Sequence, residues 1–514
     1  MNAPNGLPAD LDKLFKSAAE ARKHHDYQLS FDILERARQE YPNTVVPLLE
    51  LGNACGTRYD FAKARHYFDE AIRLAGRRTQ IYAIAGLHSL KFGNYEMARE
   101  YFGSVAERDD ATGDALTLYA EILERQRQFD ESREIVERAL KLSPQNPVAV
   151  LVSAKLHRQA GSLPEAEKNL RTFLAATPDK KFPVSRCWYE LGGNLDKQGR
   201  YDEAMDAFLQ AKALLAPQAE PHLTKLLAGR QGMRETEAEI SVETIERWSK
   251  NAENLEPLRR FTILSGHPRS GTTLLEQVLD SHPDVISADE NRIFLEESWG
   301  PVSRQFANDV TLLQRLDSQS TADLQRIRSV YFRYIEFFMG QAVNGRMLME
   351  KNPALSGMLS AALRIFPEAR FLVAIRDPRD VCLSCFMQPL PLNPISSSYL
   401  TLEGTVDQYT SAMNTWNLML PLMRNPHLLV RYEDVIENLE AESRRVLEFL
   451  GIAWDKRVLK FDEHARTKTV RSPTYADVAK PIFKTAKGRW HNYQKYLEPW
   501  LGKLEPFVKK FGYE

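Results

Sequence analysis

A short turn that combines glycine, threonine and arginine has the residue types that bind a phosphate or sulfate group. The turn GHPRSG spans Gly266 to Gly271, and Thr272 and Thr273 follow it. The residues at 261–265 are β-prone and the run after the turn is apolar at helical spacing, so a strand should enter the turn and a helix should leave it. Free amide groups and the positive dipole end at the start of a helix attract an anion. An ordinary strand-turn-helix corner is the simpler interpretation.

The spacing of this turn is close to that of the phosphate loop G-x4-G-K-[ST], with one substitution that matters. Thr272 stands at the lysine position of that motif, and the positive charge lies inside the loop as Arg269. Gly266 and Gly271 suit backbone conformations that residues with side chains resist. The sequence therefore predicts an anion site that differs from an ordinary nucleotide-triphosphate loop.

Arg376 and Ser384 form a second candidate site for an anion. Arg376 directly follows the predicted strand 371–375, and Ser384 lies two helical turns further along the chain. The two side chains could hold one phosphate from two sides. Arg376 could instead pair with Asp377 or Asp380, and the sequence alone does not separate these interpretations.

Lys351 and the segment 287–292 carry further charges next to predicted strands. Lys351 ends the strand 347–350 and could neutralise charge on a bridging oxygen, although it could also be an ordinary surface lysine. In the second segment, Asp289 and Glu290 precede Arg292, and a solvated turn is the alternative interpretation.

Composition excludes several classes of protein. The chain has 514 residues, which indicates two or more domains, and a net charge of −1, which gives no general attraction to nucleic acid or anionic membranes. Four cysteines do not make a disulfide framework, and Cys382 and Cys385 form a single C-x-x-C pair with no second pair for zinc. We expect no metal, no membrane span and no signal segment, so we expect a cytoplasmic protein.

The first half of the chain repeats with a period of 34 residues. Small residues recur at that spacing, and larger apolar residues follow four positions later: the small set is Ser30, Ala64, Ala98, Ser132 and Ala166, and the large set is Leu34, Phe68, Phe102, Val136 and Leu170. A sixth unit fits after an insertion of four residues, and it contains W-x2-L-G at 188–192 and A-x3-F at 204–208. The pattern over residues 8–217 resembles the tetratricopeptide repeat (TPR), whose helix pairs stack into a solenoid with a concave binding groove.

The second half alternates short apolar runs with helical patterns, which predicts an α/β domain. Five strands are expected, at 261–265, 285–287, 347–350, 371–375 and 428–430. Helices are expected at 272–280, 311–342, 356–366, 378–387, 403–425 and 436–451. This order implies a three-layer, P-loop-like domain with a central parallel sheet, whose ligands lie at the carboxyl ends of the strands. The loops after Ser265, Glu350 and Ile375 should then meet.

We expect three parts of the chain: a repeat solenoid over 1–235, a connector helix over 236–258 and the α/β domain over 259–514. The connector could equally be a last helix of the solenoid.

Residues 259–495 resemble the PAPS-dependent sulfotransferases, and most closely the tyrosylprotein sulfotransferase branch. The resemblance rests on motifs in one order: PRSGTTL at 268–274, HPDV at 282–285, DENR at 289–292, EKNP at 350–353, IRDPRDVCLS at 375–384, VRYED at 430–434 and FLGIAW at 449–454. A repeat array fused to such a domain is similar to a known bacterial arrangement.

The resemblance implies that PAPS is the co-substrate, PAP the product, and no metal is used. It assigns the donor to these residues: Arg269, Ser270, Gly271, Thr272 and Thr273 for the 5′ phosphate, Arg376 and Ser384 for the 3′-phosphate, Tyr432 for the nucleotide, and Ser472, Lys480, Lys487, Gly488 and Arg489 from a late segment. Gln388 stands where the branch has a further basic residue.

The resemblance also implies the catalytic groups. Arg269, Lys351 and Ser472 would stabilise charge on the departing phosphate oxygen, and Glu290 would accept the acceptor's proton. Arg292 would orient the acceptor. His282 is a rival base, because cytosolic small-molecule sulfotransferases use histidine.

Two other functions compete with the sulfotransferase interpretation. One is a kinase or nucleotide triphosphatase with a degenerate phosphate loop, against which Thr272 and the lack of an evident second strand-end aspartate argue. The other is a non-catalytic scaffold. The acceptor is open between a tyrosine in a protein or peptide held by the repeat groove, a small phenol and a sugar hydroxyl.

Overall fold

The computed structural model describes residues 8–176, 182–250, 252–257, 259–304, 310–466 and 486–513. The chain divides into two compact units, which we describe separately. The first unit contains Met1–Leu156 with Phe337–Gly340, and the second contains His157–Glu336 with Gln341–Glu514.

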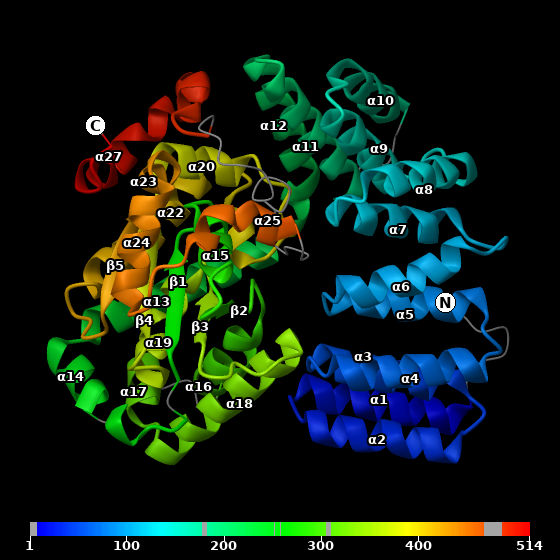
Figure 1. Cartoon of the computed structure of the whole chain (residues 1–514), viewed down its shortest axis with the longest axis horizontal. Helices are drawn as coiled ribbons and strands as arrows, with labels where there is room; N and C mark the ends of the chain where they lie inside the picture. Colours follow the sequence, from blue (N-terminus) through cyan, green and yellow to red (C-terminus); the bar gives the residue numbers. More distant parts are fainter. Residues whose placement is uncertain are drawn as a thin grey trace. The chain divides into compact units, whose positions relative to one another are not determined.

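The first unit is built from antiparallel helix pairs that follow one another along the chain (Figure 1). The helices are α1 (Ala9–Lys23), α2 (Tyr27–Glu40), α3 (Val45–Thr57), α4 (Phe61–Leu74), α5 (Thr79–Lys91), α6 (Tyr95–Ala106), α7 (Gly113–Arg125) and α8 (Phe129–Leu142). Further along the chain, α9 (Pro147–Gln159) includes the boundary between the two units, and α10 (Leu163–Ala176), α11 (Phe182–Lys197) and α12 (Tyr201–Leu215) belong to the second unit. The predicted helical repeat is confirmed, because the first residues of α3, α5, α7 and α9 are spaced 34 residues apart.

Small residues allow the two helices of a repeat to approach closely. A Cβ atom added at Gly52 would lie 2.4 Å from the Phe68 ring, and one added at Gly86 would lie 2.7 Å from Phe102. The second helices of the first repeats begin at recurring N-caps: the side chains of Asp26, Asp60 and Asn94 each accept a backbone N–H three residues later. The 34-residue period therefore reflects two recurring features: the contact between a small residue and a phenylalanine ring, and the N-cap of the second helix.

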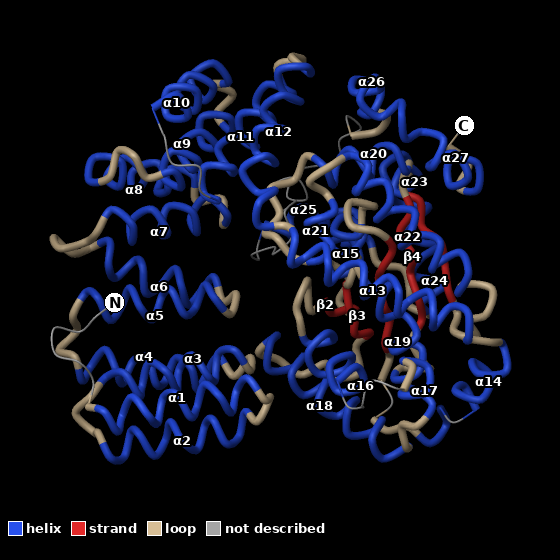
Figure 2. Tube along the Cα trace, turned by 180° about the vertical axis from the view of Figure 1, so that it is seen from behind, coloured by secondary structure: helices blue, strands red, loops and turns tan. Residues whose placement is uncertain are grey.

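The second unit surrounds a five-stranded sheet, whose strands are coloured red in Figure 2. The strands are β1 (Phe261–Gly266), β2 (Val285–Ser287), β3 (Met347–Lys351), β4 (Arg370–Ile375) and β5 (His427–Arg431). All neighbours are parallel, in the order β2-β3-β1-β4-β5. Because β1 lies between β3 and β4, the loops that follow these three strands meet at one edge of the sheet, as the sequence predicts.

Helices cover both faces of the sheet. Those after β1 are α15 (Thr272–Asp280), α16 (Gly300–Arg304), α17 (Leu312–Asp317), α18 (Thr321–Met339), α19 (Leu359–Ile365), α20 (Pro378–Phe386), α21 (Pro394–Ser398), α22 (Leu402–Met419), α23 (Tyr432–Glu437), α24 (Leu439–Leu450), α25 (Phe461–Arg466), α26 (Gln494–Leu497) and α27 (Leu501–Lys510). On one face, Leu264 and Leu372 join a buried cluster with residues of α15 and α24. On the other, the Phe261 ring packs on Tyr331 of α18 and Phe371 packs on Trp416 of α22.

Two further helices and several short ones complete the second unit. The two are α13 (Glu220–Glu239) and α14 (Val242–Lys250), so a break at residues 240–241 interrupts the segment where one connector helix is expected over 236–258. The 3₁₀-helices are η1 (Ala216–Gln218), η2 (Ala252–Asn254), η4 (Leu355–Met358), η5 (Lys456–Lys460), η6 (Arg489–Tyr493) and η7 (Glu498–Trp500), and η3 (Phe294–Trp299) is a π-helix. Among the helices described here, none is long and apolar enough to cross a membrane.

Two predicted helices are each divided in the structure. The helix expected at 311–342 is α17 followed by α18, and the Ser320 hydroxyl accepts the N–H of Asp323 where α18 starts. The helix expected at 436–451 is α23 followed by α24, with Asn438 accepting the N–H of Ala441. In both places a short polar side chain caps a new helix instead of continuing the old one.

Lys212 of α12 is buried against the segment that follows α20. Its Nζ donates to the Tyr399 carbonyl at 2.5 Å and to the Tyr189 hydroxyl at 3.3 Å, and it lies 4.0 Å from the centre of the Phe386 ring. Burial is the largest influence on its charge, and no carboxylate of the described residues contributes. Burial therefore lowers the pKa of Lys212 to about 7.

Replacing Lys212 by methionine should stabilise the protein most at low pH. Since the lysine pKa falls on folding, the unfolded chain binds more protons between about pH 7 and pH 10.5, and wild-type stability rises with pH across that window. The Lys212→Met variant should melt at a higher temperature at pH 6, with the difference shrinking towards pH 10. The exposed Lys225→Met variant is the control, and a pH-independent difference for Lys212→Met would contradict the assignment.

Candidate active site

The turn between β1 and α15 has the backbone geometry of an anion-binding loop. Gly266, Arg269 and Gly271 have φ values of +139°, +73° and +93°. A Cβ at Gly266 would lie 2.3 Å from the Ala374 carbonyl oxygen, so only glycine fits there. Gly271 is the N-cap of α15, and no side chain caps the first amide groups of this helix. These amides and the helix dipole can hold a phosphate or sulfate group.

Arg269 and Arg376 meet beside this turn, although they are far apart in sequence. Arg269 Nε donates to the Ser384 hydroxyl at 3.0 Å, and Arg376 Nη1 donates to the Arg269 carbonyl at 3.3 Å. Arg376 also donates from Nη2 to the Ala486 carbonyl at 2.6 Å and lies 3.7 Å from the Asp380 carboxylate. Its Nε is buried and has no hydrogen-bond partner among the described residues. This orphaned donor is the kind of group that an incoming phosphate would satisfy.

Lys351 joins the candidate base to the start of α15. Its side chain is fully buried, and Nζ lies 3.0 Å from Glu290 Oε1, 3.2 Å from the Thr273 hydroxyl and 2.9 Å from Glu276 Oε2. Burial by itself would lower the pKa of Lys351, but the carboxylates of Glu276, Glu290 and Asp289 outweigh it and raise the pKa above its ordinary value. Lys351 is therefore a fixed positive charge beside the anion loop.

Glu290 and Arg292 lie on the same turn but differ in environment. The Glu290 side chain is 36% exposed while it pairs with Lys351, so solvent and an acceptor can reach it. The Arg292 side chain is 73% exposed and pairs with Glu296 at 3.0 Å. Arg292 thus faces outwards from the cluster, where it is accessible to a large ligand.

Both ring nitrogens of His282, the rival base, contact backbone groups. Its Nε2 lies 2.9 Å from the Ala453 carbonyl, and its Nδ1 accepts the N–H of Asp284 at 3.1 Å. It also follows the far end of α15, whose nine residues rise about 13 Å. His282 therefore does not lie beside the groups gathered at the start of α15.

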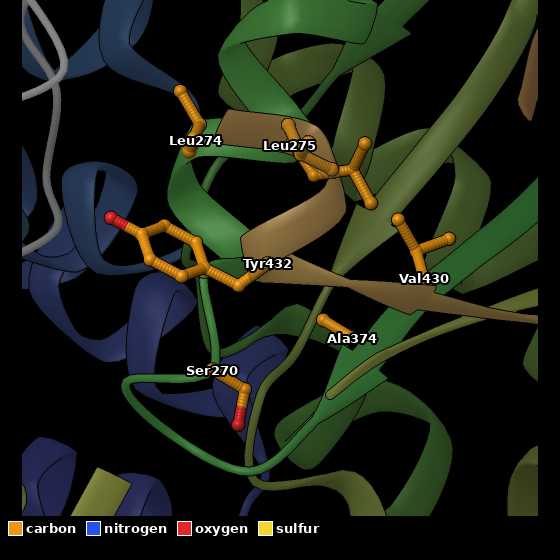
Figure 3. Close-up of a pocket in the computed structure, with 8 residues that line it drawn as sticks. Ser270, Leu274, Leu275, Ala374, Val430 and Tyr432 are labelled. Atoms are coloured by element: carbon orange, nitrogen blue, oxygen red, sulfur yellow. The ribbon is translucent and has the colours of Figure 1, made fainter. Parts of the chain in front are cut away.

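Tyr432 forms one wall of a small hollow next to the turn. Figure 3 shows its ring beside Leu274 and Leu275 of α15, with Ala374 and Val430 of the neighbouring strands and Ser270 of the turn completing the lining. The guanidinium of Arg376 lies 4.8 Å from the centre of the Tyr432 ring. The ring thus supports Arg376 as well as lining the hollow.

The predicted residues of the late segment fall into two groups. Ser472 and Lys480 lie outside the described residues. The Gly488 N–H donates to Asp380 Oδ2 at 2.8 Å, which ties this segment to α20 near Arg376. Lys487 instead pairs with Glu437, and Arg489 lies 2.7 Å from Asp196. The structure therefore brings Gly488 towards the Arg376 cluster, while the charges of Lys487 and Arg489 have other partners.

Sequence reasoning missed two buried carboxylates at this site. Glu276 contacts Lys351, and Asp380 accepts the N–H groups of both Gly488 and Trp490. The signal for Glu276 is its spacing, because it lies three positions after Thr273 and therefore on the same face of the helix. The sequence offers Asp380 only as an ion-pair partner for Arg376.

The C-x-x-C pair has no thiolate chemistry in this environment. Cys382 and Cys385 are buried and free, and Cys385 donates to the Pro268 carbonyl at 3.4 Å. Burial raises the pKa of Cys385 to about 12 and that of Cys382 well above its ordinary value. These thiols support the turn through packing.

Comparisons with known proteins match two families to different parts of the chain. Residues 262–456 match the sulfotransferase family, and residues 85–147 and 151–219 match the tetratricopeptide repeat. The chain is 25% identical over 274 residues to protein-tyrosine sulfotransferase A of Caenorhabditis elegans, an alignment that covers 49% of this chain and 67% of that protein. It is 27% identical over 267 residues to protein-tyrosine sulfotransferase 1 of Homo sapiens, covering 48% and 64%. A sulfotransferase domain from the curacin biosynthetic pathway aligns with a TM-score of 0.36 and 15% identity, covering 50% of this chain and 99% of that domain.

Substituting Gly271 by alanine should damage anion binding more than stability. The new Cβ would lie 2.6 Å from the Tyr432 ring at a position with positive φ, so the turn and the ring must both move. We expect binding of adenosine 3′,5′-bisphosphate, measured by calorimetry, to weaken about tenfold or more. Gly451→Ala is the matched control, because Gly451 has φ of +69° but open space around it. Equal binding by the Gly271→Ala variant and wild type would count against the loop as the anion site.

Proposed function

Because residues 262–456 belong to the sulfotransferase family and tetratricopeptide repeats precede them, we propose that this chain moves a sulfuryl group from PAPS to an acceptor hydroxyl. The observation that carries the proposal is the meeting of Lys351, Glu290 and Thr273 at the start of α15. This arrangement puts a fixed cation and an accessible carboxylate next to an anion loop. In-line sulfuryl transfer needs both groups at one point.

We propose that the donor is held from two sides. The amides of residues 269–273 would bind the 5′ phosphate, and Arg376 with Ser384 would bind the 3′-phosphate. Two features support this assignment: the buried Arg376 Nε has no hydrogen-bond partner in the described part of the chain, and Arg269 already contacts Ser384. Tyr432 would contact the nucleotide from the neighbouring hollow. We also propose that Gly488, whose N–H donates to Asp380 near Arg376, belongs to the donor site together with Lys480, Lys487 and Arg489.

The proposed reaction breaks the bond between sulfur and the 5′ phosphate oxygen and forms a bond between sulfur and the acceptor oxygen. As in phosphoryl transfer, a loose transition state accumulates charge on the departing oxygen. Lys351, Arg269 and Ser472 would stabilise that charge. PAP would then leave with the charged 5′ phosphate oxygen. The acceptor proton would pass to Glu290. No metal is required.

We propose a tyrosine hydroxyl of a protein or peptide as the acceptor. The names of the two protein-tyrosine sulfotransferases above support this choice, as do the exposed Arg292, which could orient an acceptor, and the repeats, which are commonly protein-binding. We also propose a cytoplasmic location for this chain, since its four free cysteines suit a reducing compartment. Labelled PAPS incubated with cell extract, followed by mass spectrometry of the labelled products, tests the acceptor class. Labelling of glycans or small phenols alone would contradict it.

The Glu290→Gln variant should bind PAP normally and fail to transfer. Glutamine keeps the shape of the side chain but cannot accept the acceptor proton, so we expect turnover to fall by about 100-fold or more. Calorimetry should give a PAP affinity within about twofold of wild type. The His282→Gln variant is the comparison and should retain transfer, provided that its melting temperature shows it to be folded. Wild-type turnover by Glu290→Gln would exclude Glu290 as the base.

The Arg376→Ala variant should lose donor affinity. Removing the guanidinium takes away charged hydrogen bonds to the 3′-phosphate, which typically costs about 1.5–3 kcal/mol, or roughly 10- to 100-fold in affinity. Arg379→Ala is the matched control, because Arg379 pairs with Asp377 instead. An unchanged PAP affinity would remove Arg376 from the site, and tight binding of ADP in place of PAP would favour the kinase alternative.

A further inference from the structure

Glu276 is a fully buried carboxylate that the proposed reaction does not use. It lies on α15 three residues after Thr273, so both side chains project from the same face of the helix. That face is directed at Lys351, whose Nζ lies 2.9 Å from Glu276 Oε2 and 3.2 Å from the Thr273 hydroxyl. Both side chains of this ion pair are completely shielded from solvent.

The contact with Glu276 determines where the Lys351 ammonium points. A buried ammonium requires partners for its charge and its three protons. Glu290 is one partner at 3.0 Å, but it is partly exposed and is the proposed acceptor of a proton. Glu276 remains as the buried carboxylate that can keep Lys351 charged and directed towards Thr273 throughout the reaction.

Glu276 also holds the turn that carries Glu290. The Ser287 hydroxyl donates to the Glu276 carboxylate, and the N–H of Asp289 donates to the Ser287 oxygen at 3.1 Å. Asp289 has a positive φ of +52°, a strained conformation for this residue, and its carboxylate accepts the N–H of Glu290 at 2.7 Å. A continuous series of hydrogen bonds thus runs from Glu276 to the backbone of Glu290.

We propose that Glu276 is a positioning residue that aligns Lys351 and the Glu290 turn with the anion loop. It acts through Lys351 and Ser287 and does not contact either substrate. The inference rests on the proposed sulfuryl transfer for its effect on turnover, while its effect on the turn can be measured without activity.

The charge of Glu276 is as important as its shape. Lys351 has the carboxylates of Asp289 at 3.5 Å and Glu290 at 3.0 Å as further partners. Neighbouring Glu350 is buried, and burial raises its pKa to about 7, so it contributes less negative charge near neutral pH. Removing the charge of Glu276 takes away the strongest electrostatic support for the charged form of Lys351 and leaves burial to oppose it.

The Glu276→Gln variant tests this proposal through kinetics. We expect kcat to fall about tenfold to 100-fold with a nearly unchanged KM for PAPS. In a plot of kcat against pH, the fall at alkaline pH should begin at a lower pH than in wild type, because Lys351 would lose its proton more readily. Glu276→Asp keeps the charge and should recover part of the loss. Glu124→Gln is the control, since Glu124 is a buried carboxylate that pairs with the partly buried Lys155 at 3.1 Å among the repeats, and this substitution should leave turnover unchanged.

Hydrogen exchange measured by mass spectrometry provides a readout that does not depend on activity. In Glu276→Gln, exchange should rise in peptides that cover residues 285–292, while Glu124→Gln should leave them unchanged. If wild type transfers no sulfuryl group, the proposed function fails, and exchange alone then decides whether Glu276 holds the turn. Unchanged exchange at 285–292, or a kcat within about twofold of wild type in an active enzyme, would overturn the proposal.

Discussion

The buried ammonium of Lys351 is the interaction on which the rest of the site depends. An isolated charge in a protein interior is strongly unfavourable, so Lys351 can remain charged only while carboxylates surround it. Those carboxylates come from α15 and from the turn after β2, and the lysine itself ends β3. One electrostatic requirement therefore fixes three segments relative to one another, and it does so beside the anion loop.

The parallel sheet makes this arrangement available. Because β1 lies between β3 and β4, the turn after β1 has Lys351 on one side and Arg376 on the other. Gly266 permits the close approach of β1 to Ala374 of β4, which brings Arg269 within reach of Arg376 and Ser384. The result is a site with two cationic sides. The proposed donor, which carries two phosphate groups on one nucleotide, requires such a pair of cationic sides.

Within the second unit, contacts connect the last repeat helices to the α/β domain. Lys212 of α12 contacts the segment after α20, and Asp196 at the end of α11 accepts the hydroxyl of Tyr493 at 2.7 Å. Since α20 also carries Ser384 and Asp380, the last repeat helices adjoin the same element that supports the Arg376 cluster. A ligand bound by these helices would lie close to elements of the site.

The sequence by itself determined the helical repeat, the order of the strands along the chain and most of the charged residues of the site, because those features are recorded in local periodicity and in short motifs. It could not show what surrounds Lys351, what His282 contacts or what Arg376 pairs with. Those answers depend on contacts between residues far apart in the chain: Lys351 with Glu276, His282 with Ala453, and Arg376 with Arg269. Burial and strand order create these contacts, and neither is a property of any single stretch of sequence.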